Sequence, residues 1–246
     1  MLRHSPVLLL VAAFLLTGCN KSSSRDTAGA ASAPTPDSSG LAFRDATSGS
    51  GVSFRHYSGA RGRKWLPETM GPGVALIDFD RDGRLDIFLV DGREFDGTQQ
   101  GSCKLFRGMG GARFEDVTEK SGAGIRLCGM GATAADYDGD GDVDILVTAW
   151  GSAALLRNDS GRFTDVGRSA GLAAIVDSSA AGAIPWSTAA AFLDGDGDGD
   201  LDLFVGQYVA WSPERDIFTT IDGVAKAFTT PDRYRGLGCK LGARRM

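Results

Sequence analysis

Histidine is nearly absent from this sequence of 246 residues, and long apolar runs are absent beyond its N-terminus. The two histidines are His4 and His56, and only His56 lies beyond the N-terminal apolar segment. One histidine cannot build the multi-histidine sites that hold catalytic zinc or iron. No later stretch is apolar enough to cross a membrane as a helix. Lys and Arg form no dense cluster, which argues against binding to nucleic acid.

Glutamate is also scarce, since only five of the 31 acidic residues are Glu. Fourteen of the Asp residues fall in three windows of nine residues, 78–86, 136–144 and 194–202. The net charge of the chain is −5, and without these fourteen side chains it would be +9. The negative charge is therefore concentrated in three places. The apolar content of 42% is ordinary and argues against disorder of the whole chain.

The three acidic windows repeat one pattern at a constant distance. Asp78, Asp136 and Asp194 each begin a segment of the form D-x-D-x-D-G-x-x-D, and successive copies are 58 residues apart. Apolar runs rich in β-branched or aromatic residues flank each segment, which is typical of buried strands. No convincing helical period longer than two turns occurs in residues 41–246. A repeat of this length holds about four short strands, so it predicts an all-β fold of β-propeller blades.

Each acidic segment is suited to a metal site made of oxygen ligands. Carboxylates at positions 1, 3, 5 and 9 can converge if the loop curls, and Gly at position 6 permits that backbone conformation. At position 7 the side chain differs between copies, so we expect only its carbonyl to bind. This hard ligand set suits Ca²⁺ better than zinc or copper. The expected side-chain ligands are Asp78, Asp80, Asp82, Asp86, Asp136, Asp138, Asp140, Asp144, Asp194, Asp196, Asp198 and Asp202, and the expected carbonyl ligands are those of Arg84, Asp142 and Asp200.

The pattern differs from an EF-hand loop in two respects. An EF-hand has a bidentate Glu at position 12, where this chain has Leu89, Val147 and Val205. The segments that flank an EF-hand loop are helices, whereas the acidic windows of this chain are flanked by predicted strands. We therefore expect about three Ca²⁺ sites, each in the loop of a β-hairpin. The alternative is a set of solvated acidic turns, but four Asp in nine residues repel one another strongly unless a cation neutralises them.

The acidic windows resemble the FG-GAP/VCBS repeats of integrin α-chain propellers. Residues 68–86 are similar to the first repeat of the cartilage acidic protein (ASPIC/UnbV) family, and residues 211–216 and 231–236 also match that family. The resemblance covers roughly residues 41–240 and implies Ca²⁺-binding propeller blades in a secreted or surface protein.

Two features depart from the ASPIC/UnbV pattern. Its members carry about seven blades, within the range in which propellers close, and often a C-terminal ASPIC/UnbV domain. Residues 43–246 hold only about 3.5 repeats of 58 residues, and the C-terminal domain does not fit in them either. We therefore expect an incomplete propeller from a truncated product; the alternative is a chain that assembles with another chain to cover its open edges.

The N-terminus resembles the signal of a bacterial lipoprotein. After a short basic start, an apolar run of about eleven residues begins at Pro6, too short to span a membrane. It ends in Leu-Thr-Gly-Cys19, which is similar to the lipobox in which the Cys is acylated. The resemblance implies a lipid anchor on Cys19 and, with Asn20, a place in the outer membrane of the cell envelope. An ordinary secretory signal is the alternative. The expected divisions are a signal peptide at 1–18, a flexible tether at 19–40 and the propeller repeats at 41–246.

The remaining cysteines, Cys103, Cys128 and Cys239, would then lie where disulfides persist. A bond between Cys103 and Cys128 is one interpretation, and two buried free thiols are the other. Spacing alone does not decide between them.

The sequence contains no recognisable catalytic motif. His56 has no nucleophile-elbow motif beside it, which favours a loop or strand-edge histidine. Paired Asp side chains suited to glycoside chemistry occur only inside the acidic windows, where a cation would occupy them. Tryptophans could line a ligand-binding face, although packing between blades is their more frequent use. The four tryptophans are Trp65, Trp150, Trp186 and Trp211.

Together these features predict a non-enzymatic, lipid-anchored scaffold of the cell envelope. Ca²⁺ would stabilise its blades, and it would bind a protein or a glycan. The alternative is a fragment of an envelope enzyme or accessory factor whose active site lies in other blades.

Overall fold

The structure is a computed structural model that describes residues 43–63, 65–95, 98, 101–173 and 184–213, together with the backbone of three strands at 218–221, 224–227 and 239–242. The predicted signal peptide, Cys19 and the tether lie outside the described residues. The chain divides into two compact units, Met1–Arg44 and Asp45–Met246. The fold and the site described below belong to the second unit.

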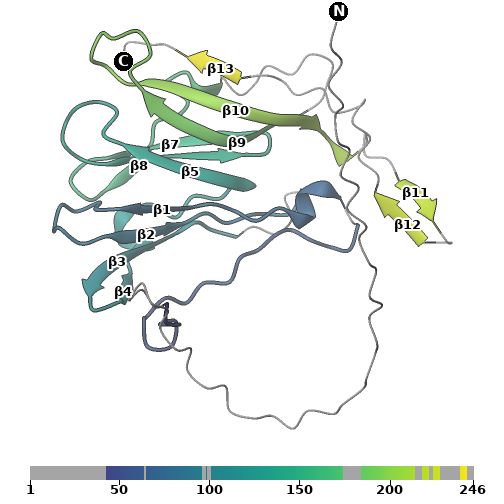
Figure 1. The fold of residues 1–246 in the computed structure, drawn as a ribbon, viewed down its shortest axis with the longest axis horizontal. Coiled ribbons are helices and arrows are strands. Elements are labelled where there is room, and N and C mark those ends of the chain that lie inside the picture. Colours follow the sequence, from purple (N-terminus) through teal and green to yellow (C-terminus); the bar gives the residue numbers. More distant parts are fainter. Residues whose placement is uncertain are drawn as a thin grey trace, which may run out of the picture. The chain divides into compact units, whose positions relative to one another are not determined.

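The first acidic window lies in a four-stranded antiparallel sheet, called sheet 1. Its strands are β1 (Val74–Ile77), β2 (Asp86–Leu89), β3 (Lys104–Gly110) and β4 (Arg113–Asp116), and each pairs with the next one in sequence (Figure 1). Val74 pairs with Leu89 and Ile77 with Asp86. The first acidic window is therefore the loop of a β-hairpin, as the sequence predicts.

The second acidic window lies in a sheet of the same topology, called sheet 2. Its strands are β5 (Gly129–Ala135), β6 (Asp144–Ala149), β7 (Ala153–Asn158) and β8 (Phe163–Asp165), again paired in sequence order. Ala135 pairs with Asp144, the last Asp of the window. Two successive repeats therefore each form four antiparallel strands, which agrees with the strand number that the repeat length predicts.

The third acidic window connects the two longest strands, β9 (Ile184–Leu193) and β10 (Asp202–Trp211). With β13 (Cys239–Gly242) they form sheet 3, in the order β13-β10-β9. A separate hairpin consists of β11 (Phe218–Ile221) and β12 (Val224–Ala227). Among the described residues the helices are short: the 3₁₀ helix η1 (Leu66–Thr69), α1 (Thr118–Ser121) and a turn at residues 172–173. None of them has the length and apolar character that a membrane crossing requires. The predicted all-β class is confirmed.

Sheet 2 is packed on both faces. Ile145 of β6 belongs to a buried cluster with Phe88 of sheet 1, whereas the next residue, Leu146, belongs to a cluster with Leu203 and Val205 of sheet 3. Successive side chains of a strand point to opposite faces, so every residue of β6 is buried. The three sheets are therefore stacked in sequence order (Figure 1).

The four tryptophans lie at the ends of the strands that are away from the acidic loops. Trp65 precedes β1, Trp150 follows β6 and Trp211 ends β10, and all four are at most 8% exposed. The ring of Trp211 makes edge-to-face contacts with Trp65, Phe95 and Trp150 at centroid distances of 5.4 to 5.6 Å. They form an aromatic core with Trp186. Core packing, which is the more frequent use of tryptophan and the one favoured from the sequence, is therefore confirmed.

Cys103 and Cys128 are free and buried. Cys103 packs in the cluster between sheets 1 and 2, and Cys128 packs among the aromatic residues. A disulfide between them is therefore wrong, and the alternative of two buried thiols is confirmed. The two thiols stay apart because the tertiary fold places their side chains in different buried clusters. The side chain of Cys239 lies outside the described residues.

We expect Cys103 and Cys128 to resist alkylation in the native protein. Burial raises the pKa of each thiol to about 11, and the thiolate is the reactive form. Iodoacetamide at pH 8 followed by peptide mapping should leave both unmodified, while unfolding in guanidinium should expose both. A peptide that links Cys103 to Cys128 under non-reducing conditions, or rapid native labelling, would contradict the structure.

Candidate metal centre

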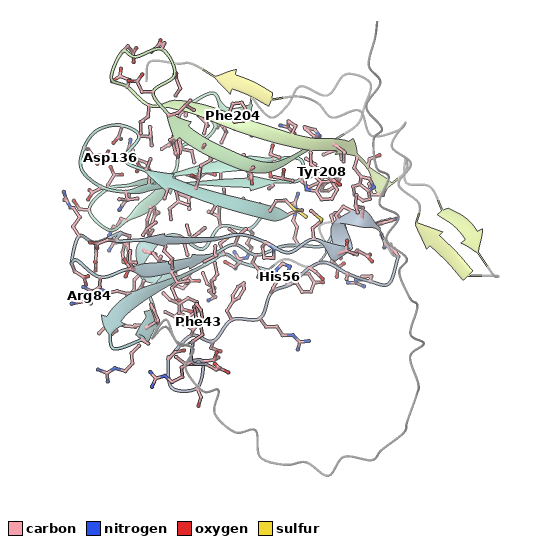
Figure 2. The ribbon with its side chains drawn as sticks, in the orientation of Figure 1. Phe43, His56, Arg84, Asp136, Phe204 and Tyr208 are labelled. Atoms are coloured by element: carbon pink, nitrogen blue, oxygen red, sulfur yellow. The ribbon has the colours of Figure 1, made fainter. Side chains whose placement is uncertain are left out.

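Three acidic hairpin loops lie at the same end of the three stacked sheets (Figure 1). Loop 1 (78–86) connects β1 to β2, loop 2 (136–144) connects β5 to β6, and loop 3 (194–202) connects β9 to β10. Figure 2 marks Arg84 in loop 1 and Asp136 in loop 2. Because the loops occupy the same place in each sheet, any site that they form is repeated three times.

The backbone of each loop curls through two residues with positive φ. Position 6 is glycine in every loop, and its φ is 81° at Gly83, 92° at Gly141 and 93° at Gly199. This bears out the conformational reason for a glycine there. Position 4 also has positive φ, which the sequence analysis missed. Glycine in loops 2 and 3 was a signal for it, but Arg81 occupies this position in loop 1, with φ 57°.

The first Asp of each loop holds the curled backbone. In loop 1, Asp78 Oδ1 accepts the N–H of Asp82 (3.0 Å) and its Oδ2 accepts the N–H of Gly83 (2.9 Å). In loop 2, Asp136 accepts the equivalent bonds at 3.1 and 2.9 Å. Asp194 accepts the N–H of Gly199 at 3.2 Å in loop 3. A carboxylate at this position thus shapes the loop in all three copies.

The last Asp of loops 1 and 2 is fully buried and joins the loop to the third strand of its sheet. Asp86 accepts the N–H of Phe79 (2.9 Å) and the N–H of Gly108 in β3 (2.7 Å). Asp144 accepts the N–H of Tyr137 (3.0 Å) and the N–H of Asn158 in β7 (2.7 Å). These residues therefore have a structural role besides the predicted one in metal binding.

Three carboxylates converge in each loop, with one oxygen of each lying within 4.8 Å of the others. Positions 1, 3 and 9 meet in loops 1 and 2, whereas positions 1, 3 and 5 meet in loop 3. Of the twelve predicted side-chain ligands, nine are thus brought together. Among the described side chains, Asp82, Asp140 and Asp202 lie outside these groups. The groups are Asp78–Asp80–Asp86, Asp136–Asp138–Asp144 and Asp194–Asp196–Asp198.

Two carboxylates of loop 2, Asp138 and Asp144, lie in an environment that disfavours their charged form. Burial raises the pKa of Asp144 to about 6; the N–H bonds that it accepts oppose this, and the charges of Asp138 and Asp140 add to it. Burial and the charge of Asp140 likewise raise the pKa of Asp138. Carboxylates crowded in this way are stabilised in their charged form by a nearby cation.

Loop 1 differs because arginine side chains already approach its carboxylates. Arg107 of β3 forms ion pairs with Asp80 (2.6 Å) and Asp82 (2.9 Å), and Arg84 also pairs with Asp82. Although burial acts to raise the pKa of Asp82, bonds from the Arg84 N–H and the Arg107 side chain lower it. A metal ion in loop 1 would thus compete with Arg107, a residue that the sequence analysis did not single out.

The side chain at position 7 points away from the metal group in loop 2. Asp142 Oδ2 accepts the N–H of Ser160 (2.8 Å), and its Oδ1 forms an ion pair with Arg81 of loop 1 (3.0 Å). The carboxylate thus links neighbouring loops, which is consistent with leaving it out of the side-chain ligand set. The carbonyl oxygens of Arg84, Asp142 and Asp200 remain predicted ligands.

The three Asp groups fit Ca²⁺ in their chemistry. Carboxylate and carbonyl oxygens are the ligands that this hard cation prefers. Asp80 Oδ1 is buried and has no hydrogen-bond partner among the described residues. An orphan acceptor of this kind beside two further carboxylates is a place where a cation would satisfy an unmet interaction.

Comparison with protein families agrees with this repeated arrangement. The FG-GAP-like repeat matches residues 78–147 and again residues 136–205. The two matches together span more than half of the chain. This chain belongs to the FG-GAP-like repeat family. No curated protein matches it.

The boundaries of the FG-GAP-like repeats coincide with the loops. Each match begins at the first Asp of one loop and ends in the strand that follows the next loop, so the two matches are offset by 58 residues. The family relationship therefore rests on the hairpins that carry the Asp groups and on the strands between them.

His56 lies apart from the three metal groups and has a structural environment. Its Nδ1 is 3.0 Å from Asp91 Oδ1, and the same oxygen accepts the N–H of Tyr57 (2.7 Å) and of Gly92 (2.9 Å). The pair thus ties the segment before β1 to the segment after β2. This environment agrees with the interpretation of His56 as a loop histidine.

Proposed function

We propose that this FG-GAP-like repeat protein is a Ca²⁺-stabilised interaction scaffold of the bacterial cell envelope. The observation that carries the proposal is the recurrence of three converging carboxylates at the same place in three stacked sheets. A single acidic turn would be an ordinary surface feature. Three copies that share positive φ at positions 4 and 6, and in each of which three carboxylates converge, favour a common ligand.

The residues of each loop have distinct tasks in this proposal. Position 1 shapes the loop and offers an oxygen, position 3 extends towards the same point, and in loops 1 and 2 position 9 fixes the loop to its sheet. Bound Ca²⁺ would supply the positive charge that offsets their mutual repulsion. Three bound ions would change the net charge of the chain from −5 to about +1.

The stacked sheets are proposed to be blades of a β-propeller. Two of them have four antiparallel strands in sequence order, and sheet 2 is packed by a neighbour on each face. Repetition of one such sheet around an axis produces a propeller. The loops of all blades would then lie on one face, where a partner can contact several of them at once.

The proposed anchor and partners rest on the sequence. The lipobox-like segment supports a lipid on Cys19, which would hold the repeats at the outer membrane by a tether of about twenty residues. We propose a non-enzymatic role, with a protein or a glycan as partner and no nucleic acid. The concentration of charge in the three Asp loops supports a binding role for that face.

Calcium binding is tested by two isosteric substitutions in loop 2. Asp138→Asn removes a charged ligand from the group, so we expect titration calorimetry to show one equivalent of Ca²⁺ fewer than in the wild type, or a site weakened at least about tenfold. Asp142→Asn changes a carboxylate that is directed at Ser160 and Arg81. This control should keep the wild-type stoichiometry.

Two results would contradict the proposal. The first is a wild type that binds no Ca²⁺ at millimolar concentration. The second is an equal loss of binding in Asp138→Asn and Asp142→Asn, since it would show a response to net charge rather than to the ligand group.

A further inference from the structure

The third strands of sheets 1 and 2 each carry an arginine at the same position. The last Asp of the loop accepts an N–H bond of 2.7 Å from Gly108 in β3 of sheet 1 and from Asn158 in β7 of sheet 2. Gly108 and Asn158 are therefore equivalent in the two repeats. The residue before each of them is an arginine, Arg107 in sheet 1 and Arg157 in sheet 2.

The two equivalent arginines have different partners. Arg107 forms ion pairs with Asp80 (2.6 Å) and Asp82 (2.9 Å), at positions 3 and 5 of loop 1. Arg157 instead pairs with Asp159 (2.9 Å), which lies just after β7 and outside loop 2. Among the described residues, Arg157 forms no ion pair with a carboxylate of loop 2. The same side chain is thus directed at the loop in sheet 1 and held away from it in sheet 2.

The residue that holds Arg157 has no charged counterpart in sheet 1. Asp159 is two residues after Arg157, and the residue two places after Arg107 is Met109. A thioether is only a weak acceptor, so Met109 cannot hold a guanidinium group as a carboxylate does. The difference between the two repeats therefore follows from one position, which is Met109 in sheet 1 and Asp159 in sheet 2.

The position of Arg107 affects any cation that enters loop 1. Its guanidinium contacts Asp80 Oδ2, and Asp80 is a member of the converging group of that loop. An entering cation is repelled by this positive charge and must displace it from the carboxylate. The converging group of loop 2 has the same three positions, 1, 3 and 9, but the arginine beside it is already paired with Asp159. The two loops should therefore differ in affinity although their carboxylates correspond.

We propose that Arg107 competes with Ca²⁺ for the carboxylates of loop 1, and that Asp159 keeps Arg157 from doing the same in loop 2. Loop 2 then binds Ca²⁺ more tightly than loop 1, and the two loops fill at different Ca²⁺ concentrations. In loop 1 the empty site is neutralised by Arg107, and Ca²⁺ binding releases this side chain. The inference rests on the proposed Ca²⁺ binding and adds which loop binds more tightly and which residues decide it.

The test measures one loop at a time in the full chain, by calorimetric titration with Ca²⁺. Asp196→Asn removes a member of the group in loop 3. Combined with Asp138→Asn it leaves the group of loop 1 intact, and combined with Asp80→Asn it leaves that of loop 2 intact. We call these double variants the loop 1 reporter and the loop 2 reporter. The loop 2 reporter should have the lower Kd, by about three- to tenfold.

The role of Arg107 is tested in the loop 1 reporter. Arg107→Gln should lower the Kd for Ca²⁺ about three- to tenfold, because the competing charge is removed. Lys104→Gln is the matched control, since it removes one positive charge from the same strand but Lys104 pairs with Asp116 (3.1 Å). This control should leave the Kd within about twofold. An unchanged Kd in Arg107→Gln, or an equal decrease in Lys104→Gln, would overturn the proposal.

The role of Asp159 is tested by a double-mutant cycle in the loop 2 reporter. Asp159→Asn should raise the Kd about three- to tenfold, because Arg157 then loses its partner and turns to the carboxylates of loop 2. When Arg157→Gln is also present, Asp159→Asn should have little effect, since no guanidinium remains to be released. Equal weakening with and without Arg157 would indicate a general effect of charge and would contradict the proposal.

A measurement in EDTA tests the same ion pairs without Ca²⁺. In the otherwise unaltered chain, Arg107→Gln should lower the melting temperature more than Arg157→Gln does, because Asp80 and Asp82 lose their counter-charge. Reporters that bind no Ca²⁺ at millimolar concentration would overturn the proposed function and this inference with it. Reporters that bind Ca²⁺ with a Kd unaffected by Arg107→Gln would overturn this inference alone.

Discussion

Removal of Ca²⁺ by EDTA is expected to lower the melting temperature of this protein by about 8–16 °C relative to 1 mM Ca²⁺. Sites in extracellular modules bind Ca²⁺ with a Kd of about 10⁻⁴ to 10⁻³ M. At 1 mM Ca²⁺, which is ten times a Kd of about 10⁻⁴ M, each ion adds about 1.4 kcal/mol to the free energy of unfolding. Three sites would add about 4 kcal/mol, a large part of the stability of a typical domain.

The structure gives the physical reason for a large effect. Asp144 is buried and accepts N–H bonds from loop 2 and from β7, so the loop proposed to bind the ion is tied directly to the sheet. Without the ion, the converging carboxylates of Asp136, Asp138 and Asp144 repel one another, and the buried position of Asp144 gives little screening by water. Removal of the ion from loop 1 should cost less stability, because Arg107 already pairs with Asp80 and offsets part of the repulsion.

Differential scanning calorimetry in 1 mM Ca²⁺, 1 mM Mg²⁺ and EDTA measures this effect. Mg²⁺ should replace Ca²⁺ poorly, because it requires a smaller octahedral shell and dehydrates reluctantly. In Asp138→Asn the difference between Ca²⁺ and EDTA should shrink, while in Asp142→Asn it should persist. Equal melting temperatures in Ca²⁺ and EDTA would contradict the role of Ca²⁺ in stabilising the fold.

Trp211→Ala is expected to lower the free energy of unfolding by about 3–5 kcal/mol. The Trp211 side chain is 1% exposed and makes ring contacts with Trp65, Phe95, Trp150 and Trp186. Its removal leaves a cavity among rigid rings that cannot collapse to fill it. Urea denaturation in 1 mM Ca²⁺ followed by circular dichroism measures the loss.

Two control substitutions test whether lost packing explains the lower free energy of unfolding of Trp211→Ala. Trp211→Phe should lose less than Trp211→Ala, because it keeps an aromatic ring and because the Trp211 indole N–H has no hydrogen-bond partner among the described residues. Tyr208→Ala should also lose less, since Tyr208 is 47% exposed although it contacts Trp186 edge-on. A loss below about 1 kcal/mol for Trp211→Ala would show that the aromatic cluster is not a stabilising core.

The repeat and its chemistry were predictable because they depend on local sequence. The spacing of 58 residues and the apolar flanks indicated short strands around each acidic window, and the structure has a β-hairpin there in all three copies. Gly141 was assigned to a special backbone conformation, which its φ of 92° bears out. The positive φ at position 4 was not predicted, because this position is Arg81 in loop 1. Only glycine in all three copies would have indicated that the backbone adopts this conformation.

Local sequence was enough to predict the fold class, the hairpin loops and the nine carboxylates that meet in them, because strand periodicity and loop curvature act over a few residues. The bond of Asp86 to Gly108, 22 residues away, and the pairing of Arg107 with loop 1 come only from the tertiary structure. It also decided that the tryptophans form a core and that Cys103 and Cys128 stay apart. These contacts depend on which strands become neighbours, and that is fixed by the packing of whole sheets rather than by any local pattern.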